Sequence, residues 1–318
     1  MHITLVTTGR VPCVGYGGRQ RQVQWLASEL AARGHDVSVL ARETGDLPGV
    51  RLIRVPKASE FTEAIPPGTD LVHFQGYRFP ARKDDVPVPF LNTPRNLKEG
   101  MDLGDANWCF ISAFQAAWQG GKTFVHNGFP VDAYRLQQEK GPRLLFLSGI
   151  ARPGKNLTAA IRLARRCDFG LDIAGGTRWS LLTRSAVRAE GAFLKTLSPR
   201  FRFHGIVDGE PKRKLLAEAR ALIFPIRVPE TFGNVMVEAM LSGTPVLATP
   251  IAAVPEVVKE GDGFLFETDE DFGAALERLD DLDPAGIRER AIDRFSMASR
   301  ADRFLEIYER ILDGERVV

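Results

Sequence analysis

The feature that most constrains this chain is the alternation of short apolar runs with amphipathic helical segments along nearly its whole length. The runs are continuously apolar, which is typical of strands buried on both faces of a parallel sheet. They lie at Ile3–Thr7, Val37–Leu40, Leu71–Phe74, Val88–Leu91, Cys109–Ile111, Leu144–Leu147, Leu171–Ala174, Phe201–Phe203, Ala221–Phe224, Pro245–Ala248 and Phe264–Phe266. Helical patterns such as Gln20–Ala32 and Leu157–Arg166 separate many of them. We therefore predict an α/β fold with doubly wound parallel sheets.

A polar segment near the middle divides the chain. A length of 318 residues suits two domains of roughly 100–200 residues each. Residues 137–142 read QQEKGP, and a new apolar run, RLLFLSG, follows directly. We predict one Rossmann-like domain over residues 1–137 and a second over 142–298. The remaining residues, 299–318, have the pattern of a helix with one apolar stripe.

Composition narrows the possible partners and the compartment. Lys and Arg number 42 against 40 acidic residues, a net charge of +2, which gives no support to a nucleic acid partner. Cys13, Cys109 and Cys167 have no metal-ligand spacing. The N-terminus lacks a signal-peptide pattern, and no apolar run approaches the roughly 20 residues that cross a bilayer. We expect a cytoplasmic protein, with weak attachment to the inner membrane face as an open alternative.

The most informative stretch is ALIFPIRVPETFGNVMVEAMLSGTPVLAT, residues 221–249. It reads as a strand, a loop, a helix from Gly233 to Ser242, a stop at Gly243 and another strand. The helix start would expose backbone N–H groups at the carboxyl end of a parallel strand. Such a position is a ready site for an anion.

Glu238 lies within this helix among apolar neighbours on all sides. An unpaired buried carboxylate costs several kcal/mol, so some group must compensate it. A pair of ligand hydroxyls, such as those of a ribose, is one candidate, and an internal ion pair with Arg or Lys is the other. Glu230 lies eight residues earlier, in the loop, where it is either a ligand contact or a solvated acid.

These residues and their flanks, PxxxPE-x-FG and EAM-x-x-G-x-P-V, resemble the E-x7-E signature of retaining glycosyltransferases of family 4. That family has the GT-B fold, in which two Rossmann-like domains face a cleft. The resemblance implies that Glu238 holds the nucleotide ribose and that Glu230 contacts the donor sugar. It also implies that the backbone at the helix start binds the donor diphosphate, through Thr231, Phe232, Gly233, Asn234 and Val235.

Other segments of the second domain extend the resemblance. In LLFLSGIARPGKNL, Lys155 follows Gly149 by six residues, as does the family's diphosphate-binding lysine. The alternative for Lys155 is a solvated loop lysine. The family's usual Arg after that glycine is Ile150 here, and Arg152 could supply the cation. The segment FRFHGIVDG resembles the loop beside the nucleotide base, contributed by Gly205, Ile206 and Val207.

In the first domain, the resemblance points to three places. Gly17 and Gly18 precede a long helix, where they let the backbone approach a phosphate or a sugar. His73 follows a strand and is expected to face the cleft, although a structural, partly buried histidine is the alternative. Asn92 occupies the position of a family histidine near the transferred sugar; it can hydrogen-bond but cannot carry a proton.

The resemblance implies a retaining transfer of a sugar from a nucleoside-diphosphate sugar to a hydroxyl acceptor. The acceptor would be a sugar, a lipid-linked molecule or another small molecule, and the first domain would bind it. Catalytic roles would fall to Glu230, His73, Asn92 and Lys155. We expect no metal ion and no cofactor, because the acidic pair Asp84-Asp85 lies in a polar loop. The last helix would return to pack on the first domain.

Several alternatives stay open. Because Ile150 and Asn92 replace the usual family residues, a nucleotide-sugar-binding protein without catalysis is one, and a nucleotide-sugar epimerase on the same fold is another. A dehydrogenase is disfavoured, since no G-x-G-x-x-G closes the first strand. The donor base, the donor sugar and the oligomeric state are open as well. The cleft-side arginines would bind an anionic acceptor or be simply solvated: Arg19, Arg21, Arg78 and Arg95.

Overall fold

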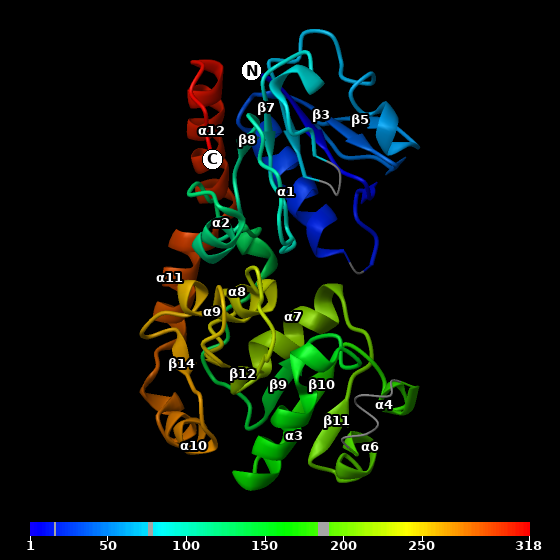
Figure 1. The fold of residues 1–318 in the computed structure, drawn as a ribbon. Helices are drawn as coiled ribbons and strands as arrows, with labels where there is room; N and C mark the ends of the chain where they lie inside the picture. Colours follow the sequence, from blue (N-terminus) through cyan, green and yellow to red (C-terminus); the bar gives the residue numbers. More distant parts are fainter. Residues whose placement is uncertain (16, 76–78, 184–190) are drawn as a thin grey trace. The chain divides into compact units, whose positions relative to one another are not determined.

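The computed structural model describes every residue except 16, 76–78 and 184–190 (Figure 1). The chain forms two compact units: unit 1 comprises Met1–Pro130 and Phe295–Val318, and unit 2 comprises Val131–Arg294. The first division comes earlier than the predicted 137–142, because Tyr134 already bonds to Glu238 of unit 2. The second comes before the predicted residue 299, because the Phe129 amide donates to the Phe295 carbonyl at 2.9 Å.

Unit 1 is built on a six-stranded parallel sheet with the order β5-β3-β1-β6-β7-β8. Its strands are β1 (His2–Val6), β3 (Asp36–Ala41), β5 (Arg51–Arg54), β6 (Leu71–Phe74), β7 (Phe90–Asn92) and β8 (Asn107–Trp108); β2 (Arg10–Val11) and β4 (Glu43–Thr44) form a separate pair. The strand order reverses between β1 and β6. Ligands of doubly wound proteins bind at such a switch point, outside the carboxyl ends of the strands.

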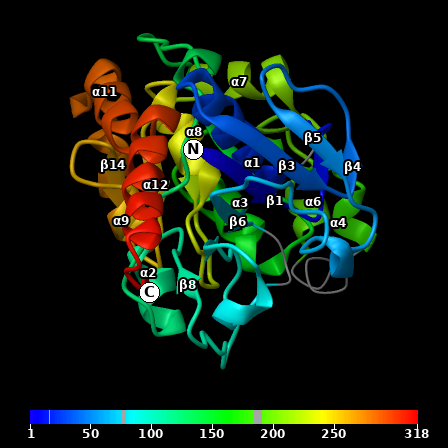
Figure 2. The same ribbon diagram turned by 90° about the horizontal axis from the view of Figure 1, so that it is seen from above.

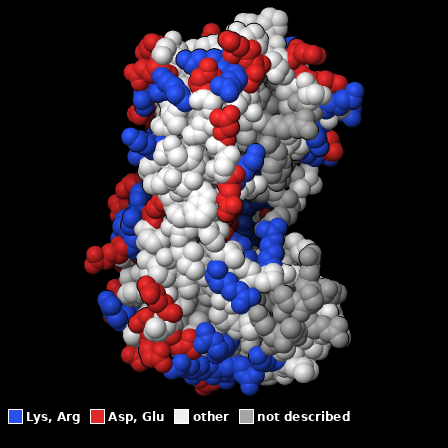
Figure 3. All heavy atoms as spheres, in the orientation of Figure 1, with Lys and Arg blue, Asp and Glu red and all other residues white. Residues whose placement is uncertain are grey.

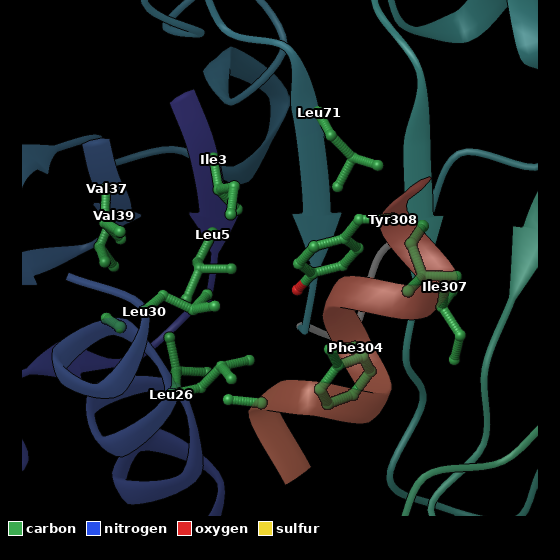
Figure 4. Packing of buried hydrophobic residues seen from close by; sticks show 14 of the residues in the cluster. Ile3, Leu5, Leu26, Leu30, Val37, Val39, Leu71, Phe304, Ile307 and Tyr308 are labelled. Atoms are coloured by element: carbon green, nitrogen blue, oxygen red, sulfur yellow. The ribbon is translucent and has the colours of Figure 1, made fainter. Parts of the chain in front are cut away.

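Two long helices cover one face of this sheet. The helices of unit 1 are α1 (Gly18–Ala32), α2 (Ala113–Gln119) and α12 (Met297–Leu312), with 3-10 turns η1 (Ala58–Glu60) and η2 (Lys83–Asp85). Helix α12 lies beside α1 (Figure 2), and its Phe304 and Tyr308 pack against Leu5 and Leu71 of the sheet (Figure 4). The last helix therefore packs on the first sheet, as predicted.

The chain end and one strand of unit 1 differ from prediction. Helix α12 ends at Leu312 rather than at the C-terminus, and Val317 instead accepts a hydrogen bond from the Trp108 amide at 2.7 Å. The predicted strand Cys109–Ile111 is replaced by β8, which ends at Trp108. Beyond it, Phe110 forms a single bridge with Phe124.

Unit 2 repeats the same topology, with the order β11-β10-β9-β12-β13-β14. Its strands are β9 (Leu144–Leu147), β10 (Leu171–Ala174), β11 (Phe201–Phe203), β12 (Ala221–Phe224), β13 (Val246–Ala248) and β14 (Gly263–Leu265). Its helices are α3 (Leu157–Arg166), α4 (Ser180–Thr183), α6 (Ala192–Lys195), α7 (Gly209–Glu218), α8 (Asn234–Leu241), α9 (Val254–Val257), α10 (Asp269–Glu277) and α11 (Pro284–Phe295), with 3-10 turns η3 (Val131–Ala133), η4 (Pro153–Lys155) and η5 (Leu279–Asp281). Strands β9 to β12 coincide with the predicted runs. The predicted doubly wound α/β architecture is confirmed.

The surface carries both signs of charge. Figure 3 shows acidic and basic side chains interspersed over the visible face, as the near-equal numbers of the two kinds lead one to expect. In the parts of the chain that the structure describes, no helix is both long and apolar enough to span a bilayer.

Candidate functional site

Four loops converge at the carboxyl edge of the unit 2 sheet, after β9, β10, β11 and β12. Gly175 has φ +109°, and a Cβ added to it would lie 1.9 Å from the Ser148 carbonyl oxygen. The amides of Gly175 and Gly176 both donate to the Gly205 carbonyl, at 2.7 and 3.2 Å. The loops thus approach at backbone distance, which only glycine permits here. The neighbouring Ile206, predicted to lie near a base, is 76% exposed.

Lys155 and Glu230 form an ion pair beside the start of α8. Lys155 ends η4, and its Nζ contacts Glu230 Oε2. The same Nζ lies 5.3 Å from the centroid of the Phe224 ring at the end of β12. Both charged side chains are about one-fifth exposed, at 19% and 21%. The cation and the carboxylate are therefore anchored but still within reach of solvent.

Gly233 sets the geometry of the helix start. It has φ +87°, and a Cβ added to it would lie 2.5 Å from Met236 Cε and 3.6 Å from Glu230 Cγ. Its carbonyl accepts a hydrogen bond from the Met236 amide at 3.0 Å, but it has no side chain that could cap the first turn of α8. The structure thus brings together the three groups that the sequence assigns to one anion site: Lys155, Glu230 and the start of α8.

The loop after β9 carries the predicted variant of the cation clamp. Ile150 is 1% exposed and belongs to the apolar core, where its Cγ1 would lie 2.6 Å from a Cβ placed on Gly176. Arg152 is exposed, and its side chain folds over Gly149. The position next to Gly149 therefore serves packing, and Arg152 stands on the same loop as Lys155.

Glu238 has partners within the protein, so it is not the unpaired buried carboxylate that the sequence suggested. Lys212 of α7 donates to both carboxylate oxygens at 2.6 Å, and the Tyr134 hydroxyl donates to Oε1 at 3.0 Å. The Glu238 side chain is 8% exposed. The internal ion pair, the alternative named above, is thus what the structure contains. Sequence reasoning missed Lys212 and Tyr134, because both partners lie far from Glu238 along the chain.

His73 is a structural histidine rather than a residue facing a cleft. It is fully buried; its Nδ1 lies 2.7 Å from the Tyr308 hydroxyl and its Nε2 2.8 Å from Thr93 Oγ1. Burial lowers the pKa of His73 well below its ordinary value, and the charges of Arg300 and Arg95 lower it further. The imidazole therefore stays neutral, and both of its nitrogens have partners within unit 1, as expected of the structural histidine named above as the alternative.

The other predicted positions of unit 1 also serve internal contacts. Asn92 is fully buried and donates to the Pro80 carbonyl at 2.7 Å, while its Oδ1 has no hydrogen-bond partner among the described residues. A Cβ added to Gly17, the N-cap of α1, would lie 2.6 Å from Cys13 Sγ. The space beside Gly17 is thus filled by the protein, and Gly18 begins the helix. Arg78 lies outside the described residues.

Part of the chain is similar in sequence to known proteins. Residues 141–281 match the family described as Glycosyl transferases group 1. A D-inositol 3-phosphate glycosyltransferase of Corynebacterium glutamicum is 31% identical over 194 residues, which are 58% of this chain and 43% of that protein. The chain therefore spans less than half the length of this curated relative.

Two solved structures share the fold over nearly the whole chain. AviGT4, a glycosyltransferase involved in avilamycin A biosynthesis, superposes with a TM-score of 0.80 and 24% identity, covering 99% of this chain and 98% of that one. Anabaena Alr3699/HepE, in complex with UDP, superposes with a TM-score of 0.75 and 16% identity, covering 97% and 100%. Both likenesses establish the architecture of the two units.

Proposed function

We propose that this chain, which matches the group 1 glycosyl transferases over residues 141–281 and has the GT-B fold, transfers a sugar from a nucleoside-diphosphate sugar to a hydroxyl acceptor. The observation that carries the proposal is the meeting of Lys155, Glu230 and the start of α8 at the carboxyl edge of one sheet. A cation and a helix N-terminus together suit a diphosphate. The Anabaena structure, solved with UDP, supports a nucleotide donor.

The ion pair suggests how the donor enters the site. An incoming diphosphate would compete with Glu230 for the Lys155 ammonium, since both are anions. Glu230 would then be released to accept hydrogen bonds from the donor sugar. The negative charge that grows on the leaving diphosphate would be stabilised by Lys155, Arg152 and the first-turn amides of α8. In this proposal no metal ion takes part, and the sugar is transferred with retention of configuration.

Glu238 can hold a ribose only by sharing its carboxylate. Oε1 already accepts from Tyr134 and Lys212, while Oε2 accepts from Lys212. A carboxylate oxygen has two acceptor positions, so one remains at Oε2. We retain a ribose hydroxyl at that position as part of the proposal.

A thermal-shift screen tests the donor assignment. We expect one of the UDP-, GDP-, ADP- or dTDP-sugars to raise the melting temperature. Lys155→Ala removes one charge-assisted contact and should weaken the binding of that nucleotide sugar about 10- to 100-fold. The control is Lys214→Ala, an exposed lysine of α7. Unchanged affinity in Lys155→Ala would overturn the assignment, and loss of transfer in EDTA, restored by magnesium, would overturn the metal-free mechanism.

One observation favours a second candidate, a nucleotide-sugar-binding protein without catalysis. Both ring nitrogens of His73 are hydrogen-bonded within unit 1 and Ile150 is a core residue, so neither offers a polar group to a substrate. The two candidates differ in a single readout. Release of nucleoside diphosphate from the stabilising nucleotide sugar, with an acceptor or slowly in water, is expected of the enzyme and contradicts the binding protein.

A further inference from the structure

Buried polar atoms without partners gather at the switch point of the unit 1 sheet. Thr7 follows β1 and Gln75 follows β6, and both residues are fully buried. Thr7 Oγ1 and Gln75 Nε2 have no hydrogen-bond partner among the described residues. The two stand side by side, because the Gln75 amide donates to the Val6 carbonyl at 2.8 Å. Buried polar groups that remain unsatisfied call for an explanation such as a bound ligand.

Thr7 Oγ1 and Gln75 Nε2 lie on the face of the sheet that α1 and α12 cover. Leu5 of β1 and Leu71 of β6 point to that face (Figure 4). Since side chains alternate along a strand, Thr7 and Gln75 point to the same face, two and four residues further on. Arg300 belongs to α12, one of the two helices that cover this face, and is only 2% exposed. Its Nε and Nη2 are likewise without a partner in the described part of the chain.

Arg95 and Arg300 lie close to this point, and both donate to amide or carbonyl oxygens. Arg95, which is partly exposed, donates to Gln75 Oε1 and to Asn127 Oδ1, each at 2.5 Å. Arg300 Nη1 donates to the backbone and side-chain oxygens of Gln22, at 3.0 and 2.8 Å. Two guanidinium groups thus meet amide oxygens at a place that is rich in donors.

The charges of these arginines act on each other. Burial lowers the pKa of Arg300 to about 10. Burial also lowers the pKa of Arg95 well below its ordinary value, and the charge of Arg300 lowers it further. Two neighbouring cations in a largely buried place raise the free energy of the folded protein, and an anion bound between them lowers it.

We infer that Gln75, Arg95 and Arg300 bind a phosphate group at this switch point, and that the phosphate belongs to the acceptor. The acceptor role rests on the proposed function, whereas the anion site does not. Two guanidinium groups match a group with a charge of about −1.5 to −2, as a phosphate monoester has at pH 7. Forked N–H donors suit its oxygens. Arg95, the partly exposed member, lies on the side open to solvent.

Inorganic phosphate is the probe that tests the site. Binding is measured by calorimetry, at constant ionic strength and in a Lys155→Ala background, so that the unit 2 anion site contributes little. We expect Arg95→Gln to weaken phosphate binding about 10- to 100-fold, because one charged contact is lost. The matched control is Arg54→Gln, at an exposed position of the edge strand β5, which should bind phosphate like the background protein.

Gln75→Glu provides the second variant. A carboxylate there would pair with Arg95 internally, so the melting temperature should rise while phosphate binding is lost. The inference is overturned if phosphate does not bind to the background protein, or if either variant binds it as tightly as the control. It is also overturned if Gln75→Glu lowers the melting temperature, because the cluster then has no need of an anion.

The acceptor role has its own readout. Phosphorylated sugars should accept the donor sugar with a lower KM than the same sugars without phosphate, and Arg95→Gln should remove that difference. Phosphate binding without any sugar transfer would leave the anion site intact and defeat the proposed function. Transfer that ignores the phosphate would support the proposed function and overturn the acceptor role.

Discussion

Glu238 is a buried carboxylate whose partners decide its role. It accepts from Lys212 and Tyr134, both within unit 2. Breaking a buried ion pair costs more than the pair itself is worth, because the remaining charge stays desolvated. The Lys212 side chain is 20% exposed, so water can replace part of the lost contact.

We therefore predict that Lys212→Met destabilises unit 2 by about 3 kcal/mol, near the low end for a buried pair. The double variant with Glu238→Gln should recover most of this loss, since a neutral amide replaces the orphaned carboxylate. Urea unfolding followed by fluorescence measures both. Lys214→Met on the same helix is the control, because the Lys214 side chain is 69% exposed. Equal losses in the single and double variants would contradict the prediction.

The sequence predicted the charged residues of the unit 2 site but not all their partners. Lys155, Glu230 and Gly233 were predicted from their resemblance to the family's motifs, and all three lie in loops after strands that a parallel sheet brings to one edge. Lys212 could not, since it lies on another helix and nothing local links it to Glu238. His73 was predicted to face a cleft because it lies at a strand end. A helix can also bury a residue at a strand end, and here Tyr308 of α12 packs against His73.

At the scale of elements, Lys140 links the first segment of unit 2 to the C-terminal ends of two helices through hydrogen bonds. Its Nζ donates to the carbonyls of Ala217 in α7 and Ser242 after α8, at 3.0 and 2.9 Å, and to Thr244 Oγ1 at 2.9 Å. Carbonyls at helix C-termini attract a cation. Burial nevertheless lowers the pKa of Lys140 from 10.5 to about 8.

A pH dependence follows from this pKa. Between about pH 8 and 10.5 the unfolded chain holds the lysine proton and the folded chain does not, so the free energy of unfolding increases with pH in that window. Lys140→Met should remove this increase. The check is the difference in melting temperature between wild type and variant from pH 7 to 10. We expect the melting temperature of wild type minus that of the variant to increase with pH. A decrease would mean that the carbonyls raise the pKa of Lys140 more than burial lowers it.

The elements themselves followed from the sequence most closely where both sheet faces are buried. Strands β9 to β12 are short, continuously apolar runs, and their bounds coincide with the prediction. The edge strand β5 was not predicted, because Arg51 and Arg54 flank just two apolar residues. At Cys109–Ile111 an apolar run did not continue the strand. Apolar character thus reports burial better than it reports strand pairing.

At the scale of the whole molecule, the two units differ in how the chain builds them. Unit 2 is one continuous segment with its own apolar core. Unit 1 needs both ends of the chain, because Phe304, Ile307, Tyr308 and Ile311 of α12 complete a core that begins with β1. The last residues also bond to β8, where the Trp108 amide donates to the Val317 carbonyl.

Separate expression of the two pieces tests this difference. The fragment 131–294 should unfold cooperatively and keep the nucleotide-induced rise in melting temperature, since it contains Lys155, Glu230 and α8. The fragment 1–130 should lack near-ultraviolet circular dichroism, because without α12 its sheet leaves an apolar face exposed to water. Adding residues 295–318 to that fragment through a flexible linker should restore the signal. A folded 1–130 fragment would show that α12 is dispensable, and a folded 131–294 fragment without a nucleotide response would mean that unit 2 alone does not form the donor site.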